Sequence, residues 1–185
     1  MMTNLALLTT RNNPFVGNFL MLSLRAGIDF GCIIFDSKVL SEKALGIVRE
    51  RLNDSYKLKD INLFRELMLY KEFESHNSKD TVQYLIELGI SHLISLGSPR
   101  ILSVDILTSF QGVIGIHPGL IPRFRGCTNV EWAIFEDEQI GNSVFFLTEE
   151  VDRGPIILQE PLIFSRSDTY KDIRTKVYTS GLKLL

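Results

Sequence analysis

Short apolar runs alternate with amphipathic helical patterns along this chain, and the alternation limits the folds open to it. Apolar side chains recur at helical spacing in residues 15–26, 40–52 and 78–88. The apolar runs typical of buried strands are residues 4–8, 28–35, 90–96, 112–117, 144–147 and 155–164. A strand–helix–strand order favours a parallel sheet. We predict a single-domain, Rossmann-like α/β fold, with five or six strands in a mostly parallel, twisted sheet and helices on both faces.

Turn and capping residues set the expected ends of the helices. Glycine adopts the left-handed conformation at a helix C-terminus, and Ser, Thr, Asn and Asp cap the N-terminus. The residues expected to end or begin helices are Gly27, Gly89, Ser103, Thr128 or Asn129, and Asp168. A charged segment at residues 60–69 is expected to be helical as well.

Size and charge narrow the class of protein. The chain has 185 residues, the size of one domain with a core of its own. Twenty basic and 22 acidic residues give a formal net charge of −2 with no long basic run, which disfavours a nucleic-acid partner. No apolar run approaches the 18 residues that suggest a membrane span. We therefore expect a cytoplasmic protein with no membrane partner.

The segment from Gly112 to Gly126, GVIGIHPGLIPRFRG, is the first candidate site. Its apolar run leads to His117, and the Pro–Gly pair that follows stops a strand or helix. Arg123 and Arg125 make the following loop cationic, and such a loop is suited to binding a ligand. The alternative is that His117 is a packed or capping residue, which is the commoner role for a histidine at a strand end.

A second polar loop favours the functional reading of His117. The segment VDRGPIILQ places Asp152 about 35 residues further on, after another apolar run. Open α/β sheets bind their ligands at the carboxyl ends of strands, where such loops meet. We therefore expect His117 and Asp152 to lie at one sheet edge.

The sequence gives weaker indications for the roles of three other residues. Arg11 can hold an anion at the N-terminus of the first helix, or be a solvated loop residue. The two cysteines lack the spacing of a metal site or a disulfide framework. Cys32 is expected in the core, while Cys127, near the candidate site, is either inert or a reactive thiol. We expect no metal.

The segments GIHPGLIPRFRG and VDRGPIILQ, with LISLGSPRILSVDIL before them, resemble the folate-dependent formyltransferase family. This family includes glycinamide ribonucleotide, methionyl-tRNA and sugar N-formyltransferases. The resemblance implies a formyltransferase-like catalytic domain over residues 1–185. This domain is expected to lack a C-terminal extension that some relatives carry. It also implies that His117 and Asp152 are catalytic and that 10-formyltetrahydrofolate is the co-substrate.

The resemblance further assigns residues around the reaction centre. Gly115 stands at the position of the family's catalytic Asn, and Gly119 at that of a common serine. The residues expected to border the folate are Pro99, Arg100, Ile101, Leu102, Leu107, Thr148, Glu149, Glu150 and Val151. Those expected to contact the acceptor are Arg11, Pro118, Gly119 and Arg125.

The expected function is transfer of a formyl group to a primary amine of a small molecule, an amino sugar nucleotide being favoured. The first loop, TTRNNPF, lacks the glycine-rich phosphate cradle expected for a purine-pathway acceptor. Two alternatives stay open. The first is a hydrolase that releases formate from the folate. The second is a catalytically impaired folate- or sugar-binding module, because Gly115 offers no side-chain donor to an oxyanion. A homodimer is also open.

Overall fold

The computed structural model describes residues 3–64 and 66–185 and divides the chain into two compact units. The first unit holds the described residues up to Ser41 and Leu58–Ile114, and the second holds Glu42–Lys57 and Gly115–Leu185. The strands follow the order β3-β2-β1-β4-β5-β6-β7 in a seven-stranded sheet. The predicted α/β class is confirmed. The assignment of residues 1–185 to one catalytic domain stays a prediction.

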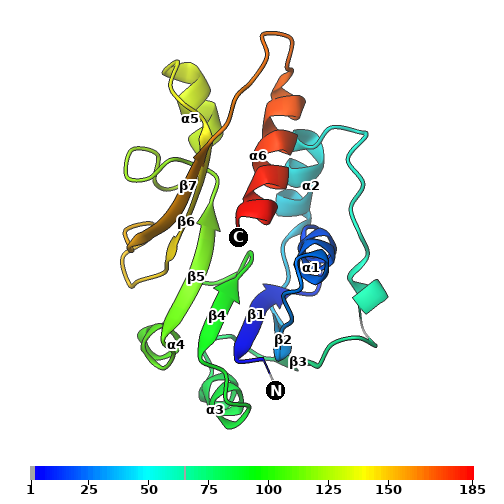
Figure 1. Cartoon of the computed structure of the whole chain (residues 1–185), viewed down its shortest axis with the longest axis vertical. Helices are drawn as coiled ribbons and strands as arrows, with labels where there is room; N and C mark the ends of the chain where they lie inside the picture. The colour runs from blue at the N-terminus through cyan, green and yellow to red at the C-terminus, as the bar shows by residue number, and fades with distance from the viewer. Residues whose placement is uncertain (1–2, 65) are drawn as a thin grey trace. The chain divides into compact units, whose positions relative to one another are not determined.

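The first unit is built from parallel strands with intervening helices. In chain order its elements are β1 (Leu5–Thr10), α1 (Val16–Arg25), β2 (Cys32–Asp36), η1 (Ile61–Phe64), β3 (Tyr70–Phe73), α3 (Lys79–Glu87), β4 (His92–Ser95) and α4 (Val104–Thr108). β1 pairs with β2 and β4, and β2 pairs with β3, all in parallel (Figure 1). This confirms the parallel sheet expected from the β-α-β opening.

The burial of β2 shows why its sequence is a continuous apolar run. All five residues from Cys32 to Asp36 are buried, so both faces of the strand are covered. Strands of parallel sheets have this pattern because their crossover connections cover both faces. β1 is buried in the same way from Ala6 to Thr10. The core therefore surrounds the strands whose C-terminal ends carry the polar loops.

The second unit is an antiparallel pair of strands packed with helices. β5 (Gly112–His117) ends in it, and it continues with α5 (Asn129–Phe135), β6 (Gly141–Phe146), β7 (Ile156–Pro161) and α6 (Tyr170–Leu184), while α2 (Glu42–Arg51) joins from earlier in the chain. β6 and β7 are antiparallel. α2 lies against α6 (Figure 1). Phe124, Val130 and Val177 belong to its core.

The structure corrects several local predictions. Residues 60–69 do not form a regular α-helix, since only Ile61–Phe64 form a 3-10 turn; Arg65 lies outside the described residues. β3 (Tyr70–Phe73) was not expected, because three of its four residues are exposed and the strand lacks an apolar run. The strand expected at residues 28–35 begins only at Cys32.

Helix capping also differs in part from expectation. Gly27 and Gly89 have φ of 72° and 70° just after α1 and α3, as predicted. Ser103 precedes α4 but its side chain makes no capping hydrogen bond. Thr128 holds the N-cap position of α5 with φ of 57° and also makes no side-chain cap. The Asn129 side chain instead lies against the Gly126 carbonyl oxygen and Nε2 of His117.

Candidate active site

β5 delivers His117 to the interior of the second unit. The strand is largely buried from Gly112 to His117, and the imidazole itself is only 6% exposed. Its ring meets Phe145 of β6 edge-on, with the ring centroids 6.5 Å apart. Packing on one face and polar neighbours at both ring nitrogens fix the orientation of the imidazole.

The Nδ1 side of His117 faces Asp152. Oδ2 of Asp152 lies 3.5 Å from Nδ1, and the carboxylate-bearing side chain is only 13% exposed. Asp152 lies between β6 and β7 and has φ of 54°, a left-handed conformation that Asp adopts more readily than most residues. The structure thus brings together the two residues that sequence reasoning placed at one sheet edge.

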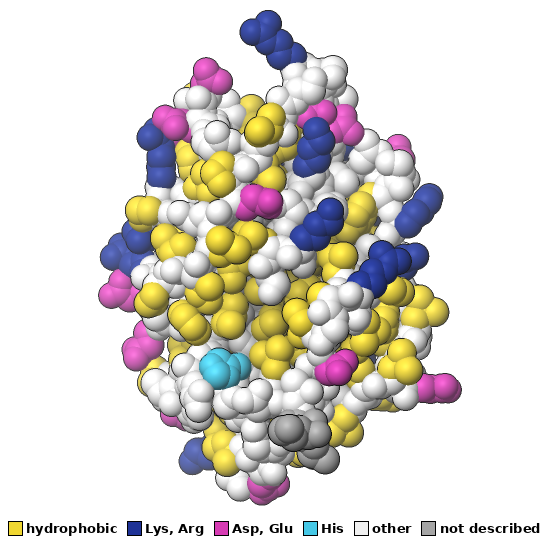
Figure 2. Space-filling model, in the orientation of Figure 1, with side chains coloured by type: hydrophobic (Ala, Val, Ile, Leu, Met, Phe, Trp, Pro, Cys, Tyr) yellow, Lys and Arg dark blue, Asp and Glu magenta, His cyan; other side chains and the backbone are white. Residues whose placement is uncertain are grey.

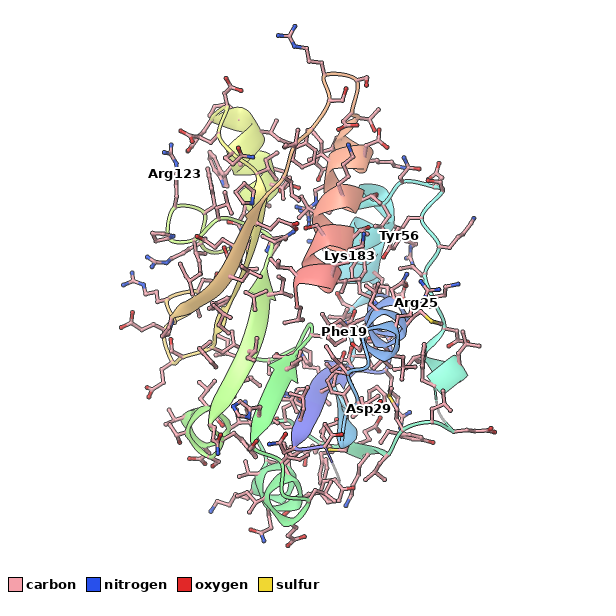
Figure 3. The ribbon with its side chains drawn as sticks, in the orientation of Figure 1. Phe19, Arg25, Asp29, Tyr56, Arg123 and Lys183 are labelled. Atoms are coloured by element: carbon pink, nitrogen blue, oxygen red, sulfur yellow. The ribbon has the colours of Figure 1, made fainter. Side chains whose placement is uncertain are left out.

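The cationic loop holds Asp152 in place. The backbone N–H of Gly126 donates to Oδ2 of Asp152 at 2.8 Å, and Nε of Arg125 donates to the Asp152 carbonyl at 2.8 Å. Arg123, labelled in Figure 3 on the loop between β5 and α5, instead pairs with Glu136 and Glu138. Arg125 is therefore tied to the aspartate loop, while Arg123 is neutralised by acidic neighbours.

The Nε2 side of His117 has two buried polar neighbours. The Phe124 carbonyl oxygen lies 2.7 Å from Nε2, and Nδ2 of Asn129 lies 2.8 Å from it. Asn129 was expected only as a candidate helix cap. The signal that identifies it is spatial: the loop after His117 turns back and brings a buried asparagine to the ring.

The two glycines of the GIHPG segment are closely surrounded. A Cβ at Gly115 would lie 2.6 Å from Cδ2 of Leu147, the flexible end of a half-buried side chain. A Cβ at Gly119 would lie 2.6 Å from the Phe124 carbonyl oxygen and 3.1 Å from Nε2 of His117. Pro118 between them is half-buried. Leu147 occupies the space beside Gly115 that a larger residue would need.

The residues expected to border the folate divide between the two units. In the first unit, Ser98 Oγ donates to the Arg100 carbonyl, and Nδ2 of Asn77 donates to the Ile101 carbonyl at 2.9 Å. The backbone N–H of Ser103 donates to Oδ1 of the same asparagine at 2.9 Å. Ile101 is 75% exposed while Leu102 is buried. The loop after Pro99 is thus rigidly held and presents one large apolar side chain.

Leu107 completes the first group and is half-buried in α4. The second group, from Thr148 to Val151, forms an exposed turn after β6 in the second unit. The Thr148 hydroxyl donates to the Glu150 carbonyl, which closes the turn. Val151 is 60% exposed. Each group therefore presents an exposed apolar residue beside backbone polar groups.

Arg100 belongs to a polar cluster that sequence reasoning missed. Its Nε donates to both oxygens of Asp36, at 3.1 and 3.0 Å, and the Asp36 side chain is fully buried. The His76 backbone N–H donates to Oδ2 of Asp36 at 2.9 Å. His76 is itself buried, as a structural residue is expected to be, with Nδ1 3.3 Å from the Ser98 hydroxyl. The cluster ties together three loops of the first unit.

Burial and hydrogen bonding shift both ionisable groups of this cluster. Burial alone raises the pKa of Asp36, but hydrogen bonds from the His76 and Lys38 backbone and from Arg100 outweigh it and lower the pKa below its ordinary value. Burial lowers the pKa of His76, because the charged imidazolium is poorly solvated there. The cluster therefore holds Asp36 charged and His76 neutral at pH 7.

Arg11 lies at the end of β1 and pairs through Nε with Glu72 of β3. Its guanidinium carbon is 5.1 Å from the centroid of the Phe35 ring. With Phe35, Tyr70 and Asn62, Arg11 lines a cavity of about 190 Å³ in the first unit. The arginine is thus held by partners on neighbouring strands and lines a partly aromatic cavity.

The remaining features to describe are the surface charge, the length of the helices, possible metal ligands and the two cysteines. On the face in Figure 2, acidic and basic side chains are interspersed among hydrophobic ones. Within residues 3–64 and 66–185, no helix is long and apolar enough to cross a membrane. In that same part of the chain, no three His, Cys, Asp or Glu residues group as metal ligands. Cys32 is buried and Cys127 is exposed.

The fold and site together define an α/β protein in which a buried histidine at the end of β5 faces a half-buried aspartate on the loop after β6. Comparison with known proteins makes this class more specific. The sequence model described as "Formyl transferase" matches residues 26–185. The chain therefore belongs to the formyl transferase family, as the resemblance of its motifs implied.

Individual relatives agree with this assignment. The methionyl-tRNA formyltransferase of Clostridium tetani is 25% identical over 130 residues, which cover 69% of this chain and 42% of that protein. A phosphoribosylglycinamide formyltransferase from Streptococcus pneumoniae has a similar fold, with a TM-score of 0.69, 19% identity and coverage of 97% and 93% of the two chains. A sugar N-formyltransferase from a Shewanella species gives a TM-score of 0.66 at 19% identity, covering 97% of this chain and 65% of that one. The chain spans less than half the length of the Clostridium relative.

Proposed function

We propose that this chain transfers a formyl group from 10-formyltetrahydrofolate to the primary amine of a small molecule. The observation that supports this most directly is the buried His117 with Asp152 Oδ2 at 3.5 Å from its Nδ1. A histidine of this kind supplies a fixed N–H donor and a site for proton transfer. Membership of the formyl transferase family supports the same chemistry.

The two ring nitrogens of His117 have different roles in this proposal. Nε2 is enclosed by the Phe124 carbonyl and the Asn129 amide, so Nδ1 is the nitrogen that serves the reaction. The 3.5 Å separation from Asp152 is longer than a normal hydrogen bond, and Nδ1–H therefore stays able to donate to a third atom. The Asp152 carboxylate stabilises positive charge on the ring and accepts the proton of the attacking amine, directly or through water.

The amine attacks the formyl carbon of 10-formyltetrahydrofolate to give a tetrahedral oxyanion. The oxyanion collapses to the formamide as the C–N bond to tetrahydrofolate breaks, and the proton lost by the amine ends on the departing nitrogen. In this proposal the exposed Ile101 side chain and the loop that carries it border the folate in the first unit. The exposed Val151 side chain is proposed separately as a folate contact of the second unit. Leu102 and Leu107 support that loop from the buried side. Apolar side chains beside fixed backbone donors and acceptors suit a planar heteroaromatic ring.

Gly115 limits the rate in this proposal. A side-chain donor at this position would help to stabilise an oxyanion, and loss of one such donor typically costs on the order of 10² to 10³ in rate. The Nδ1–H of His117 then carries the main share of the stabilisation. The chain is therefore proposed to be a slow enzyme rather than an inert one.

The proposed acceptor is an amino sugar linked to a nucleotide. The fold shared with a sugar N-formyltransferase supports this class, as does the absence of a glycine-rich phosphate cradle in TTRNNPF. The cavity in the first unit has Phe35 and Tyr70 in its wall and offers aromatic faces to such a ligand. Arg11 also lines it and, because its Nε is ion-paired with Glu72, can contact a ligand only through its other N–H groups. Arg125, Pro118 and Gly119 are proposed acceptor contacts on the His117 side.

Release of tetrahydrofolate tests this proposal. The protein is incubated with 10-formyltetrahydrofolate, with and without candidate amino-sugar nucleotides, and tetrahydrofolate is followed over time. Release that depends on the acceptor is the expected result. Release without an acceptor supports the hydrolase, and folate binding without release supports the impaired binding module, so either outcome contradicts formyl transfer.

A further inference from the structure

Nε2 of His117 lies between a hydrogen-bond donor and a hydrogen-bond acceptor. The Phe124 carbonyl oxygen, 2.7 Å away, can only accept, while the Asn129 amide nitrogen, 2.8 Å away, can only donate. A ring nitrogen either carries a hydrogen or accepts one. In the neutral imidazole, Nε2 therefore satisfies only one of these two neighbours at a time.

A third residue fixes the orientation of the Asn129 amide. Nδ2 of Asn129 also lies 2.8 Å from the Gly126 carbonyl oxygen, to which it donates. The reversed amide would place its oxygen against that carbonyl, and two acceptors would then face each other. The second hydrogen on Nδ2 is thus left to point at Nε2. Asn129 is 4% exposed, so water does not readily replace this donor.

The opposite side of the ring favours the same protonation. Oδ2 of Asp152 faces Nδ1, and a carboxylate accepts hydrogen bonds but does not donate them. A hydrogen on Nδ1 is attracted to this oxygen, whereas a lone pair there would be repelled. Asp152 and Asn129 together match the neutral tautomer with hydrogen on Nδ1 and none on Nε2. The Phe124 carbonyl becomes the partner of Nε2 when the ring gains a second proton.

Gly119 makes room for this contact. A Cβ at this position would lie 3.0 Å from Cβ of Asn129 and 3.1 Å from Nε2 of His117, as well as 2.6 Å from the Phe124 carbonyl oxygen. Any side chain here would push the amide and the imidazole apart. The absence of a side chain at Gly119 and the reach of Asn129 are therefore two parts of one arrangement.

We propose that Asn129 is a positioning residue that holds neutral His117 in the Nδ1–H tautomer, with the hydrogen on the edge of the ring that faces Asp152 rather than on the edge that faces Phe124. The catalytic consequence rests on the proposed formyl transfer, because Nδ1–H is the donor used there. The tautomer itself is a property of the folded protein without any ligand. It can be measured independently of activity.

Nitrogen-15 spectra of the imidazole rings test the proposal. The chain has three histidines, and the His117 signals are identified by their loss in His117→Gln. The ligand-free wild-type protein, measured at a pH where the ring carries a single proton, is expected to show hydrogen on Nδ1 and none on Nε2. Asn129→Ala is expected to shift the ring toward the Nε2–H tautomer, since Phe124 is then the one remaining partner there. A wild-type ring with hydrogen on Nε2, or an unchanged tautomer in Asn129→Ala, would overturn the proposal.

A second variant keeps the proposal testable if Asn129→Ala does not fold. Asn129→Asp keeps the size of the side chain but replaces the donor by acceptors, and it is expected to draw a hydrogen onto Nε2. Circular dichroism and thermal unfolding of each variant report whether it is folded. An Asn129→Asp ring that stays in the Nδ1–H form also contradicts the proposal.

Activity then separates positioning from mere structural support. Asn129→Ala is expected to lower kcat about tenfold with little change in KM for either substrate, the effect of one neutral hydrogen bond lost in the transition state. If the expected tautomers are found but no formyl transfer occurs in any protein, the role of Asn129 stands and the proposed function fails. If transfer occurs with the same kcat in Asn129→Ala, the positioning role fails while the proposed function stands.

Discussion

Oδ2 of Asp152 lies 3.5 Å from Nδ1 of His117, although the two residues are 35 positions apart. The backbone N–H of Gly126 donates to that same oxygen, so the carboxylate is oriented by the loop that follows the histidine. Asp152 accepts this bond from a left-handed backbone conformation. The His117–Asp152 pair is thus assembled by contacts within the second unit.

Removal of the carboxylate charge should lower the activity without unfolding the protein. Asp152→Asn keeps the size of the side chain but no longer stabilises charge on His117, and we expect kcat to fall by on the order of 10² to 10⁴. Steady-state kinetics and circular dichroism measure the two effects. Glu50→Gln, which neutralises an exposed carboxylate on α2, is the control and should retain wild-type activity. Equal activity of both variants would remove Asp152 from the mechanism.

A donor at position 115 should accelerate the reaction once Leu147 makes room for it. The Leu147 side chain would lie 2.6 Å from a Cβ at Gly115, so Gly115→Asn alone requires it to move. We expect Gly115→Asn/Leu147→Ala to raise kcat, by up to on the order of 10²-fold. Gly115→Ala/Leu147→Ala is the matched control without a donor. A rate no higher than that of the control would contradict the missing-donor explanation.

The stability of the protein should fall as the pH drops below the ordinary pKa of histidine. Burial lowers the pKa of His76, so the unfolded chain binds a proton that the folded state does not, and the stability that depends on neutral His76 is lost below about pH 6.5. For one proton the slope approaches about 1.4 kcal/mol per pH unit. Urea unfolding between pH 7 and 5 measures it.

The control for this pH dependence is His76→Gln, which removes the titrating group and should flatten the curve between pH 7 and 5. Burial raises the pKa of Asp36, but hydrogen bonds from His76, Lys38 and Arg100 outweigh it and lower the pKa below its ordinary value of 3.8. A second loss of stability is therefore expected below about that pH. Its sign is the same, because the unfolded chain again binds the proton first. A wild-type stability that rises between pH 7 and 5 would contradict this account.

The two cysteines should differ strongly in reactivity. Burial raises the pKa of the Cys32 thiol to about 12, whereas Cys127 is exposed on the loop before α5. Titration of the folded protein with a thiol reagent at pH 8 should therefore detect one fast thiol, absent in Cys127→Ser. Both thiols should react after unfolding in urea. Two fast thiols in the folded state would contradict the burial of Cys32.

The sequence predicted the parts of the fold that have a strong apolar period. β1, β2, β4 and β5 lie within or near the expected runs, because buried parallel strands require continuous apolar residues. β3 was not predicted because Tyr70–Phe73 is an exposed edge strand with charged residues at two of its four positions. Its pairing with β2 depends on the neighbouring strand and leaves little trace in its own sequence.

The candidate site was predictable where residue types alone suggested chemistry. His117 and Asp152 follow apolar runs and were placed at one edge by the logic of parallel strands. Asn129 was read only as a helix cap, since nothing in the local sequence reveals that its amide turns back to a ring 12 residues earlier. The space taken by Leu147 beside Gly115 was equally hidden, because it depends on the packing of two separate segments.

Transfer of a labelled formyl group tests the central claim most directly. The protein is given 10-formyltetrahydrofolate carrying carbon-13 in the formyl group, together with amino-sugar nucleotides, and the products are identified by mass spectrometry and NMR. We predict a labelled formamide on the acceptor amine, formed at least about 10²-fold more slowly by His117→Gln. Label that appears only as formate, or a labelled formamide formed by His117→Gln at the wild-type rate, would contradict the assignment of formyl transfer to this site.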